Sequence, residues 1–217
     1  MSLFSLLQLL NQDIPYNKTI MNFTIDFLKK EQIKEVIPFL SKLRIKIFKE
    51  YPYLYDGDLE YEKEYLNTYA NSKNAFVISL SLNNRIIGAC TAIPLLEEVD
   101  EFKTPLTKEN YKIEELFYIG EIILEKEFRN CGKGKELMQT AITYIKNNYP
   151  KYKKIIICTV NRDNNSYPIP NEYKDLKYLW EKFNFKKLER PIAYFSWKEI
   201  NETEESLKPM NFWITTV

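Results

Sequence analysis

Histidine is entirely missing from the 217 residues of this sequence. A Ser-His-Asp triad, a Cys-His nucleophile pair and a histidine-ligated zinc or iron site all need that side chain, so these classes of site are excluded. Cysteine is scarce as well, because Cys90, Cys131 and Cys158 are widely separated and form no C-x-x-C pair. We therefore expect no zinc ribbon, no disulfide scaffold and no metal, and a reducing, cytoplasmic setting.

Long apolar runs and an excess of one charge are absent too. No stretch approaches the roughly 18 apolar residues that a membrane-spanning helix needs. The apolar start, MSLFSLLQLL, lacks the basic region and the small-residue cleavage site of a signal peptide. The 31 basic and 30 acidic residues leave a net charge of +1, which argues against a nucleic acid or a membrane surface as the partner.

Hydrophobic periodicity indicates one mixed α/β domain over residues 22–198. The expected elements are a strand over 22–27, helices over 33–48 and 59–70, hairpin strands around Asn83-Asn84, a strand over 117–125, a helix ending before Pro150, a buried strand over 154–160, a helix over 173–183 and a strand over 193–197. Asp58 is the expected N-cap of the second helix, and residues 97–112 form a loop or a short helix. Outside the domain, residues 1–21 form an N-terminal extension, and residues 199–217 form a C-terminal extension that could add a strand.

Glycine occurs only five times, and two of the five stand close together in the segment RNCGKG, Arg129 to Gly134. The segment lies between an expected strand and an expected helix. Glycines at such a junction let backbone N–H groups face outward at the helix N-terminus, where the helix dipole also favours an anion. Arg129, Lys133 and Lys135 add positive charge, so the segment predicts a phosphate-binding loop. A glycine-rich helix start that binds nothing is the alternative interpretation.

The segment EIILEKEFRNCGKGKEL, residues 121–137, resembles the acyl-CoA-binding motif of the GNAT acetyltransferase superfamily, whose loop pattern is [RQ]-x-x-G-x-[GA]. A second stretch, WEKFNF at 180–185, is similar to the helix end Tyr-Glu-Lys-x-Gly-Phe of that family. The resemblance implies an α/β fold whose central mixed sheet is splayed at a V between two parallel strands, with helices on both faces. It also implies a cofactor site for acetyl-CoA, in which Ile122 and Leu124 face pantetheine. The residues implied to hold the pyrophosphate are Arg129, Asn130, Cys131, Gly132, Lys133, Gly134 and Lys135.

The sequence departs from the family pattern at two positions. Trp180 stands where the family often has the tyrosine that protonates the leaving thiolate, and an indole cannot supply that proton. Asn184 replaces a glycine, which is tolerable because asparagine also adopts the left-handed conformation. The loop over 162–172 is longer than the family norm. Tyr167 in that loop is the replacement acid that we favour, and Tyr178 is a weaker one because it points to another face of the helix.

Two further sets of residues are candidates for the acceptor side of the site. Glu121 lies on the motif strand, where a carboxylate could take a proton from an amine directly or through water. A strand glutamate that is only paired with a lysine is the alternative. Tyr53, Tyr55 and Asp56 follow the first long helix, where the family fold places part of the acceptor wall. Aromatic rings with one acid suit a cationic amine, although ordinary core and turn packing would use the same residues.

These features together predict an N-acetyltransferase that moves an acetyl group from acetyl-CoA to a primary amine, on a small molecule or a protein, by direct attack. No activated nucleophile is available for an acyl-enzyme. The alternative is a catalytically weak CoA-binding or regulatory module with the same fold, which Trp180 motivates. A homodimer is left open.

Overall fold

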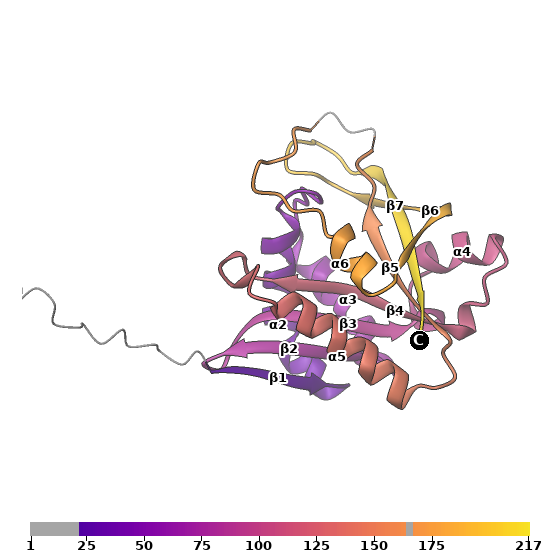
Figure 1. The fold of residues 1–217 in the computed structure, drawn as a ribbon. Coiled ribbons are helices and arrows are strands. Elements are labelled where there is room, and N and C mark those ends of the chain that lie inside the picture. Colours follow the sequence, from indigo (N-terminus) through magenta and orange to yellow (C-terminus); the bar gives the residue numbers. More distant parts are fainter. Residues whose placement is uncertain (1–21, 164–166) are drawn as a thin grey trace, which may run out of the picture.

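The computed structural model describes residues 22–163 and 167–217, so the expected N-terminal extension lies outside the described residues. Within them, seven strands form one mixed sheet in the order β1-β2-β3-β4-β5-β7-β6 (Figure 1). The strands are β1 (Phe23–Leu28), β2 (Phe76–Leu82), β3 (Arg85–Pro94), β4 (Leu116–Leu124), β5 (Lys154–Val160), β6 (Lys186–Trp197) and β7 (Ser206–Thr216). The helices are α2 (Glu31–Phe48), α3 (Leu59–Asn71), α4 (Asp100–Lys108), α5 (Lys133–Asn148) and α6 (Lys177–Lys182).

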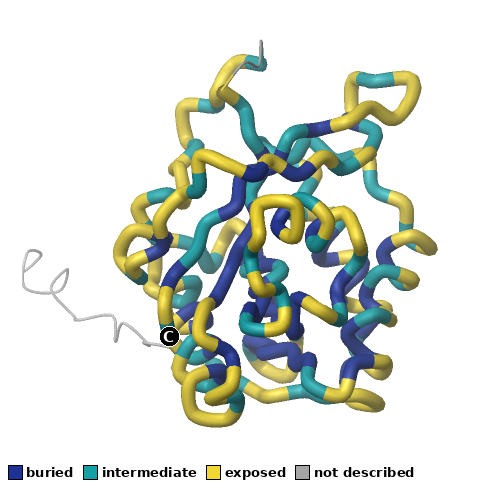
Figure 2. Tube along the Cα trace, turned by 90° about the vertical axis from the view of Figure 1, so that its right-hand side faces the viewer, coloured by how far each residue is buried: buried dark blue, intermediate teal, exposed yellow. Residues whose placement is uncertain are grey.

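Each face of the sheet carries its own hydrophobic core. Helices α2, α3 and α4 cover one face, and α5 and α6 cover the other (Figure 1). Phe117 and Tyr118 are neighbours in β4, yet Phe117 belongs to the α5 core and Tyr118 to the α2 core, because successive side chains alternate across a strand. Figure 2 shows that the buried residues gather along the strands, while the exposed residues lie on loops and outer helix turns.

The sheet opens between its two parallel strands. β4 pairs with β5 only at Leu116–Lys154, Phe117–Ile155 and Tyr118–Ile156, and the two strands then separate. β5 continues against β7 at seven register positions, up to Val160 opposite Met210. β4 continues against β3 as far as Leu124. The expected mixed α/β fold with a V between two parallel strands is therefore confirmed.

Several local expectations agree with the structure. Asp58 caps α3, because its carboxylate accepts a hydrogen bond from the Tyr61 N–H at 2.7 Å. The hairpin turn between β2 and β3 has Asn83 and Asn84 at φ 51° and 63°, the left-handed pair that a type I′ turn needs. Residues 97–112, expected as a loop or a short helix, contain the nine-residue helix α4.

The C-terminal part differs from the expectation in two ways. Residues 199–217, expected as an extension that could add a strand, do contain strand β7, but this strand is inserted between β5 and β6, so residues 206–216 are an inner part of the sheet. β6 begins at Lys186 instead of residue 193, and its register with β7 shifts between Lys187 and Ile192. The irregular pairing around Pro191, which has no N–H to donate, hides the first half of this strand from a pattern search.

Candidate active site

The open edge of β4 presents backbone groups that have no strand partner on the β5 side. The Glu125 N–H donates to the Ile87 carbonyl oxygen of β3 at 2.9 Å. Because successive N–H groups in a strand point to opposite sides, the N–H groups of Leu124 and Ile122 point toward the side that β5 has left. β4 thus offers two backbone donors at a place where an extended ligand could pair with it.

A β-bulge in β4 places two successive residues on the same face. Thr91 of β3 lies opposite Glu121, while the next residue, Ala92, lies opposite Ile119, so Gly120 is the extra residue. A Cβ on Gly120 would lie 2.3 Å from the Tyr69 hydroxyl oxygen and 2.9 Å from Thr91 Oγ1, which only glycine avoids. The bulge turns the Glu121 side chain toward α2 and α3.

The loop after β4 leads into an uncapped helix N-terminus. Asn130 and Gly132 have φ of 62° and 87°, and no side chain in the described part of the sequence caps α5. The first N–H groups of the helix therefore lack an intrahelical acceptor. Among the described residues, a Cβ on Gly134 would meet no atom within 4 Å, so they leave open space above the first turn of α5. This geometry can hold an anion against the helix N-terminus.

The three basic side chains around this loop have different surroundings. The Arg129 guanidinium donates to both carboxylate oxygens of Glu50, at 2.6 and 3.0 Å, and its Nε donates to the Leu124 carbonyl oxygen at 2.8 Å. Arg129 therefore fixes the loop to the end of α2. The Lys133 ammonium pairs with Glu136 at 2.8 Å and lies 4.6 Å from the centre of the Phe23 ring. The Lys135 side chain is exposed at the helix start.

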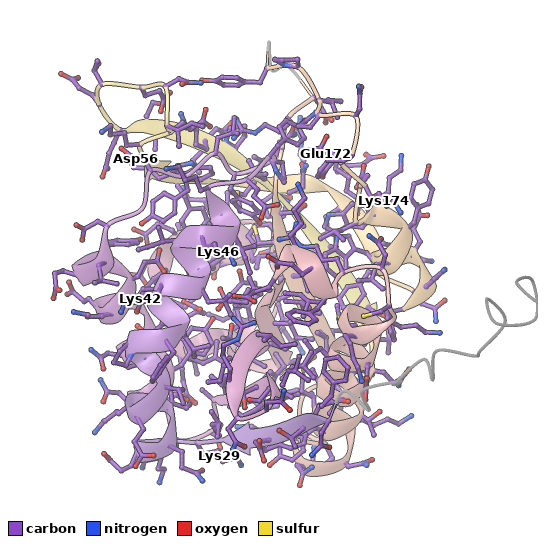
Figure 3. All side chains as sticks on the ribbon, turned by 90° about the vertical axis from the view of Figure 1, so that its left-hand side faces the viewer. Lys29, Lys42, Lys46, Asp56, Glu172 and Lys174 are labelled. Atoms are coloured by element: carbon purple, nitrogen blue, oxygen red, sulfur yellow. The ribbon has the colours of Figure 1, made fainter. Side chains whose placement is uncertain are left out.

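The loop before α6 also reaches the segment between β4 and α5. Lys126 pairs with Glu172 at 3.7 Å, and Lys174 donates to the Asn130 side-chain oxygen at 3.2 Å. Figure 3 shows Glu172 and Lys174 on the segment that approaches the end of α2 and the loop after β4. The rings of Tyr51 and Tyr173 meet edge to face at 4.7 Å. Burial raises the pKa of Tyr173 to about 12, so its hydroxyl is protonated at neutral pH.

A buried ion triad joins α2, α3 and β4. Arg44 pairs with Glu62 through Nε and with Glu121 through its NH1 nitrogen. The side chains of Arg44, Glu62 and Glu121 are 10%, 1% and 3% exposed. Burial works against the charged form of Arg44, but the adjacent Glu62 carboxylate outweighs it and the pKa of Arg44 is raised. One oxygen of Glu121, Oε1, is buried and lacks a hydrogen-bond partner among the described residues.

The expected acceptor residues lie in different environments. The Tyr53 ring packs against Phe48 at 4.7 Å, and burial raises the pKa of its hydroxyl. Burial and a hydrogen bond to Glu62 raise the pKa of Tyr55, which connects this residue with the triad. Asp56 pairs instead with Lys198 at 2.8 Å, which lowers the pKa of its carboxyl, and Figure 3 shows it at the outer edge of the molecule. Contacts through Glu62 and Arg44 therefore connect Tyr55 with Glu121. Asp56 pairs with Lys198 instead of this network.

Trp180 and the two tyrosines expected as replacement acids lie in different environments. Trp180 is buried in the α5 core. The helix around it closes with Asn184 at φ 59° and a hydrogen bond from the Phe185 N–H to the Trp180 carbonyl oxygen, so asparagine takes the left-handed place of the family glycine. Tyr167 lies beyond residues 164–166, which are outside the described residues, and its ring centre is 5.9 Å from the Arg162 guanidinium carbon. Tyr178 is 63% exposed on α6.

Sequence reasoning did not identify Arg44 and Glu62 as site residues, although the spacing of apolar residues in both helices indicates that they are buried. In α2 the buried positions 33, 37, 40 and 44 recur at helical spacing, and the last of them is an arginine. In α3 the buried positions 62, 66 and 69 recur in the same way, and the first is a glutamate. Opposite charges on the inward stripes of two successive helices indicate a buried ion pair.

A mixed sheet that opens between parallel strands, followed by a glycine-containing loop at a helix N-terminus, defines an α/β protein that can hold an extended, phosphate-bearing ligand along β4. The profile of the family described as "Acetyltransferase (GNAT) family" matches residues 40–168. The chain therefore belongs to the GNAT acetyltransferase family. A search among curated proteins finds no relative of this chain.

Solved structures with the same fold include two acetyltransferases and NAA60. The ribosomal-protein-alanine N-acetyltransferase of Brucella melitensis has a TM-score of 0.57 at 11% identity, covering 89% of this chain and 99% of that one. A GNAT family acetyltransferase of Elizabethkingia anophelis with acetyl-CoA bound has a TM-score of 0.52 at 20% identity, covering 90% and 99%. Arabidopsis thaliana NAA60 in complex with a bisubstrate analogue has a TM-score of 0.54 at 15% identity, covering 89% and 98%. At these identities the likeness shows the fold.

The described part of the chain contains neither a membrane-spanning helix nor a metal-binding cluster. Within residues 22–163 and 167–217, no helix is long and apolar enough to cross a membrane. The same residues contain no group of three or more Cys, Asp or Glu side chains placed to hold a metal ion.

Proposed function

We propose that this protein is an acetyl-CoA-dependent N-acetyltransferase whose acceptor is a primary amine. The observation that carries the proposal is the continuity between the unpaired edge of β4 and the uncapped N-terminus of α5 with its open space above Gly134. One side of this path offers backbone donors for an amide-containing arm, and its end offers N–H groups for phosphate. Acetyl-CoA contains these two parts in this order.

The cofactor residues take separate roles in this proposal. The backbone N–H groups of Ile122 and Leu124 pair with the pantetheine arm. Those of Lys133, Gly134 and Lys135 bind the pyrophosphate, with Asn130, Cys131 and Gly132 shaping the turn. Arg129 supports the loop through Glu50 instead of contacting phosphate, because its guanidinium is already bonded at 2.6 and 3.0 Å.

The acceptor side follows from the charge of the buried triad. Two carboxylates share one guanidinium, so an ammonium ion is attracted to the Glu121 side of β4. Tyr53 and Tyr55 line this approach from the segment after α2. The triad makes a protonated amine a better match than a hydroxyl or a carboxylate as the acceptor.

Transfer proceeds by direct attack, with Glu121 as the base. The carboxylate removes one proton from the ammonium, and the freed nitrogen pair forms the C–N bond to the acetyl carbon while the C–S bond breaks. The Oε1 atom of Glu121 is the available acceptor, because Oε2 is held by Arg44. The nitrogen gives up its second proton to solvent as the amide forms, and the departing thiolate takes a proton from solvent or from Tyr167, since Trp180 has no proton to give.

Thiol release from acetyl-CoA with a panel of primary amines tests this function. We expect CoA to appear only when an amine is present, and acetyl-CoA to stabilise the protein against heat in the absence of the amine. Stabilisation by acetyl-CoA without thiol release for any amine would instead support the binding or regulatory module that Trp180 motivates. If acetyl-CoA has no effect in either assay, both functions are wrong.

A further inference from the structure

The buried triad contains more negative charge than its single cation neutralises. Arg44 contacts Glu62 through Nε and Glu121 through its NH1 nitrogen, and no other arginine or lysine pairs with either glutamate among the described residues. With all three side chains ionised, the group carries one net negative charge on side chains that are at most 10% exposed. A second buried carboxylate next to Glu121 works against the charged form of Glu121.

The geometry makes the two carboxylates unequal. Glu62 is also hydrogen-bonded to the Tyr55 hydroxyl, whereas Glu121 keeps one oxygen without a partner. Thr91, which lies opposite Glu121 on β3, likewise has a buried hydroxyl without a partner among the described residues. Buried oxygens without partners mark a place where a polar ligand or a water molecule is expected. A proton that enters the triad therefore goes to Glu121, which has the free oxygen.

The aromatic neighbours keep Arg44 in its shared position. The guanidinium carbon lies 4.6 Å from the centre of the Tyr65 ring and 5.0 Å from that of Phe48. These rings hold the cation between α2 and α3 and prevent it from turning wholly toward β4. Glu62 and Glu121 therefore compete for one positive charge.

We propose that Glu62 is a positioning residue for the transfer reaction, which draws part of the Arg44 charge away from Glu121 and so keeps Glu121 basic enough to deprotonate the acceptor. This inference rests on the proposed role of Glu121 as the base. A carboxylate paired one to one with arginine is a weak base, because the cation stabilises its charged form. Sharing the cation with Glu62 removes part of that stabilisation without leaving Arg44 unpaired.

The other titratable groups that face the triad are five tyrosines and one glutamate. They are Tyr53 and Tyr55 after α2, Tyr61, Tyr65 and Tyr69 on α3, and Glu98 before α4. Burial raises the pKa of each of these tyrosines, so all of them stay neutral. Burial also raises the pKa of Glu98, which accepts hydrogen bonds from Tyr65 at 3.2 Å and Tyr69 at 2.8 Å. Glu98 is therefore the one further acid that an experiment must separate from Glu121.

The test is the pH dependence of kcat/KM for acetyl transfer, measured for three variants. In Glu62→Gln, Arg44 pairs with Glu121 alone. The acidic limb of the pH profile, where kcat/KM falls as the base becomes protonated, should therefore move to lower pH by about one unit or more, and the maximum kcat/KM should be lower. In Arg44→Gln, the cation is gone, so the limb should move to higher pH. Glu98→Gln is the matched control and should keep the limb at its wild-type pH.

Opposite shifts support the inference, because loss of packing alone would not move the two variants in opposite directions. An unmoved limb in Glu62→Gln, or shifts of the same sign, would overturn it. If Arg44→Gln does not fold, the double variant Arg44→Gln/Glu62→Gln replaces it, and its limb must lie above that of Glu62→Gln. A wild-type limb in Glu121→Gln shows instead that the base assignment fails, which is distinct from a failure of the role of Glu62.

Discussion

Valine at position 134 should separate cofactor binding from folding. Gly134 lies in the first turn of α5 outside the left-handed region, and a Cβ there meets no atom of the described residues within 4 Å. The free protein therefore has room for the side chain. Valine is also slightly better than glycine in a helix, by about a few tenths of a kcal/mol, so the folded state should lose no stability.

Binding of acetyl-CoA, in contrast to folding, should be weakened by valine at this position. A phosphate at the helix N-terminus would occupy the space above Gly134, and the two methyl groups of valine would fill it. For the wild-type protein, acetyl-CoA at about 100 times Kd adds roughly 2.7 kcal/mol to the free energy of unfolding. For a chain of this size that corresponds to a rise in Tm of about 5–10 °C.

Thermal unfolding with and without acetyl-CoA measures both effects in one experiment. We expect Gly134→Val to unfold at or slightly above the wild-type temperature without ligand, and to show no rise with acetyl-CoA. Gly134→Ala is the matched control, because the family pattern accepts alanine there, and it should keep most of the rise. An undiminished rise in Gly134→Val would show that the phosphate does not lie against this turn, and the proposed path along β4 would then be wrong.

Three further changes have defined outcomes in steady-state assays. Glu121→Gln should lower kcat by roughly 10²-fold or more with little change in acetyl-CoA affinity, because it removes the general base but no cofactor contact; a wild-type kcat would rule this base out. Trp180→Tyr should change the rate little or raise it modestly, and a complete loss with an intact fold would give the indole a role that we have not assigned. Turnover should be unaffected by EDTA, because the sequence has no histidine and its cysteines are dispersed; activity that disappears with EDTA and returns with a divalent ion would contradict this.

Local patterns predicted most of the elements around the proposed cofactor path. The β4 strand, the RNCGKG loop and α5 were expected because apolar alternation, two glycines and a helical stripe follow one another without interruption. The left-handed conformation of Asn184 and the cap at Asp58 were also foreseeable, since each depends on one residue and its immediate neighbours. Features of this kind are encoded within a few residues of where they appear.

Features that depend on distant partners could not be predicted in the same way. The insertion of β7 beside β5 pairs Val160 with Met210, and nothing local to either strand specifies that partner. Asp56 was expected at the acceptor wall, yet Lys198 on the turn between β6 and β7 engages it at 2.8 Å. Pairing with a lysine was the alternative to a base role for Glu121, and the residue that pairs with it is Arg44, which is 77 positions away on α2 (121 − 44). Tertiary packing decides such pairs.

The most direct test of acetyl transfer is the fate of an isotopically labelled acetyl group. Wild-type protein would be incubated with labelled acetyl-CoA and an amine that supports thiol release, and the products would be analysed by mass spectrometry. We predict one labelled N-acetyl group on the amine for each CoA released, with no label retained on the protein as an acyl-enzyme. Free labelled acetate in place of the N-acetyl product, or a stoichiometric acyl-enzyme, would contradict direct transfer to an amine.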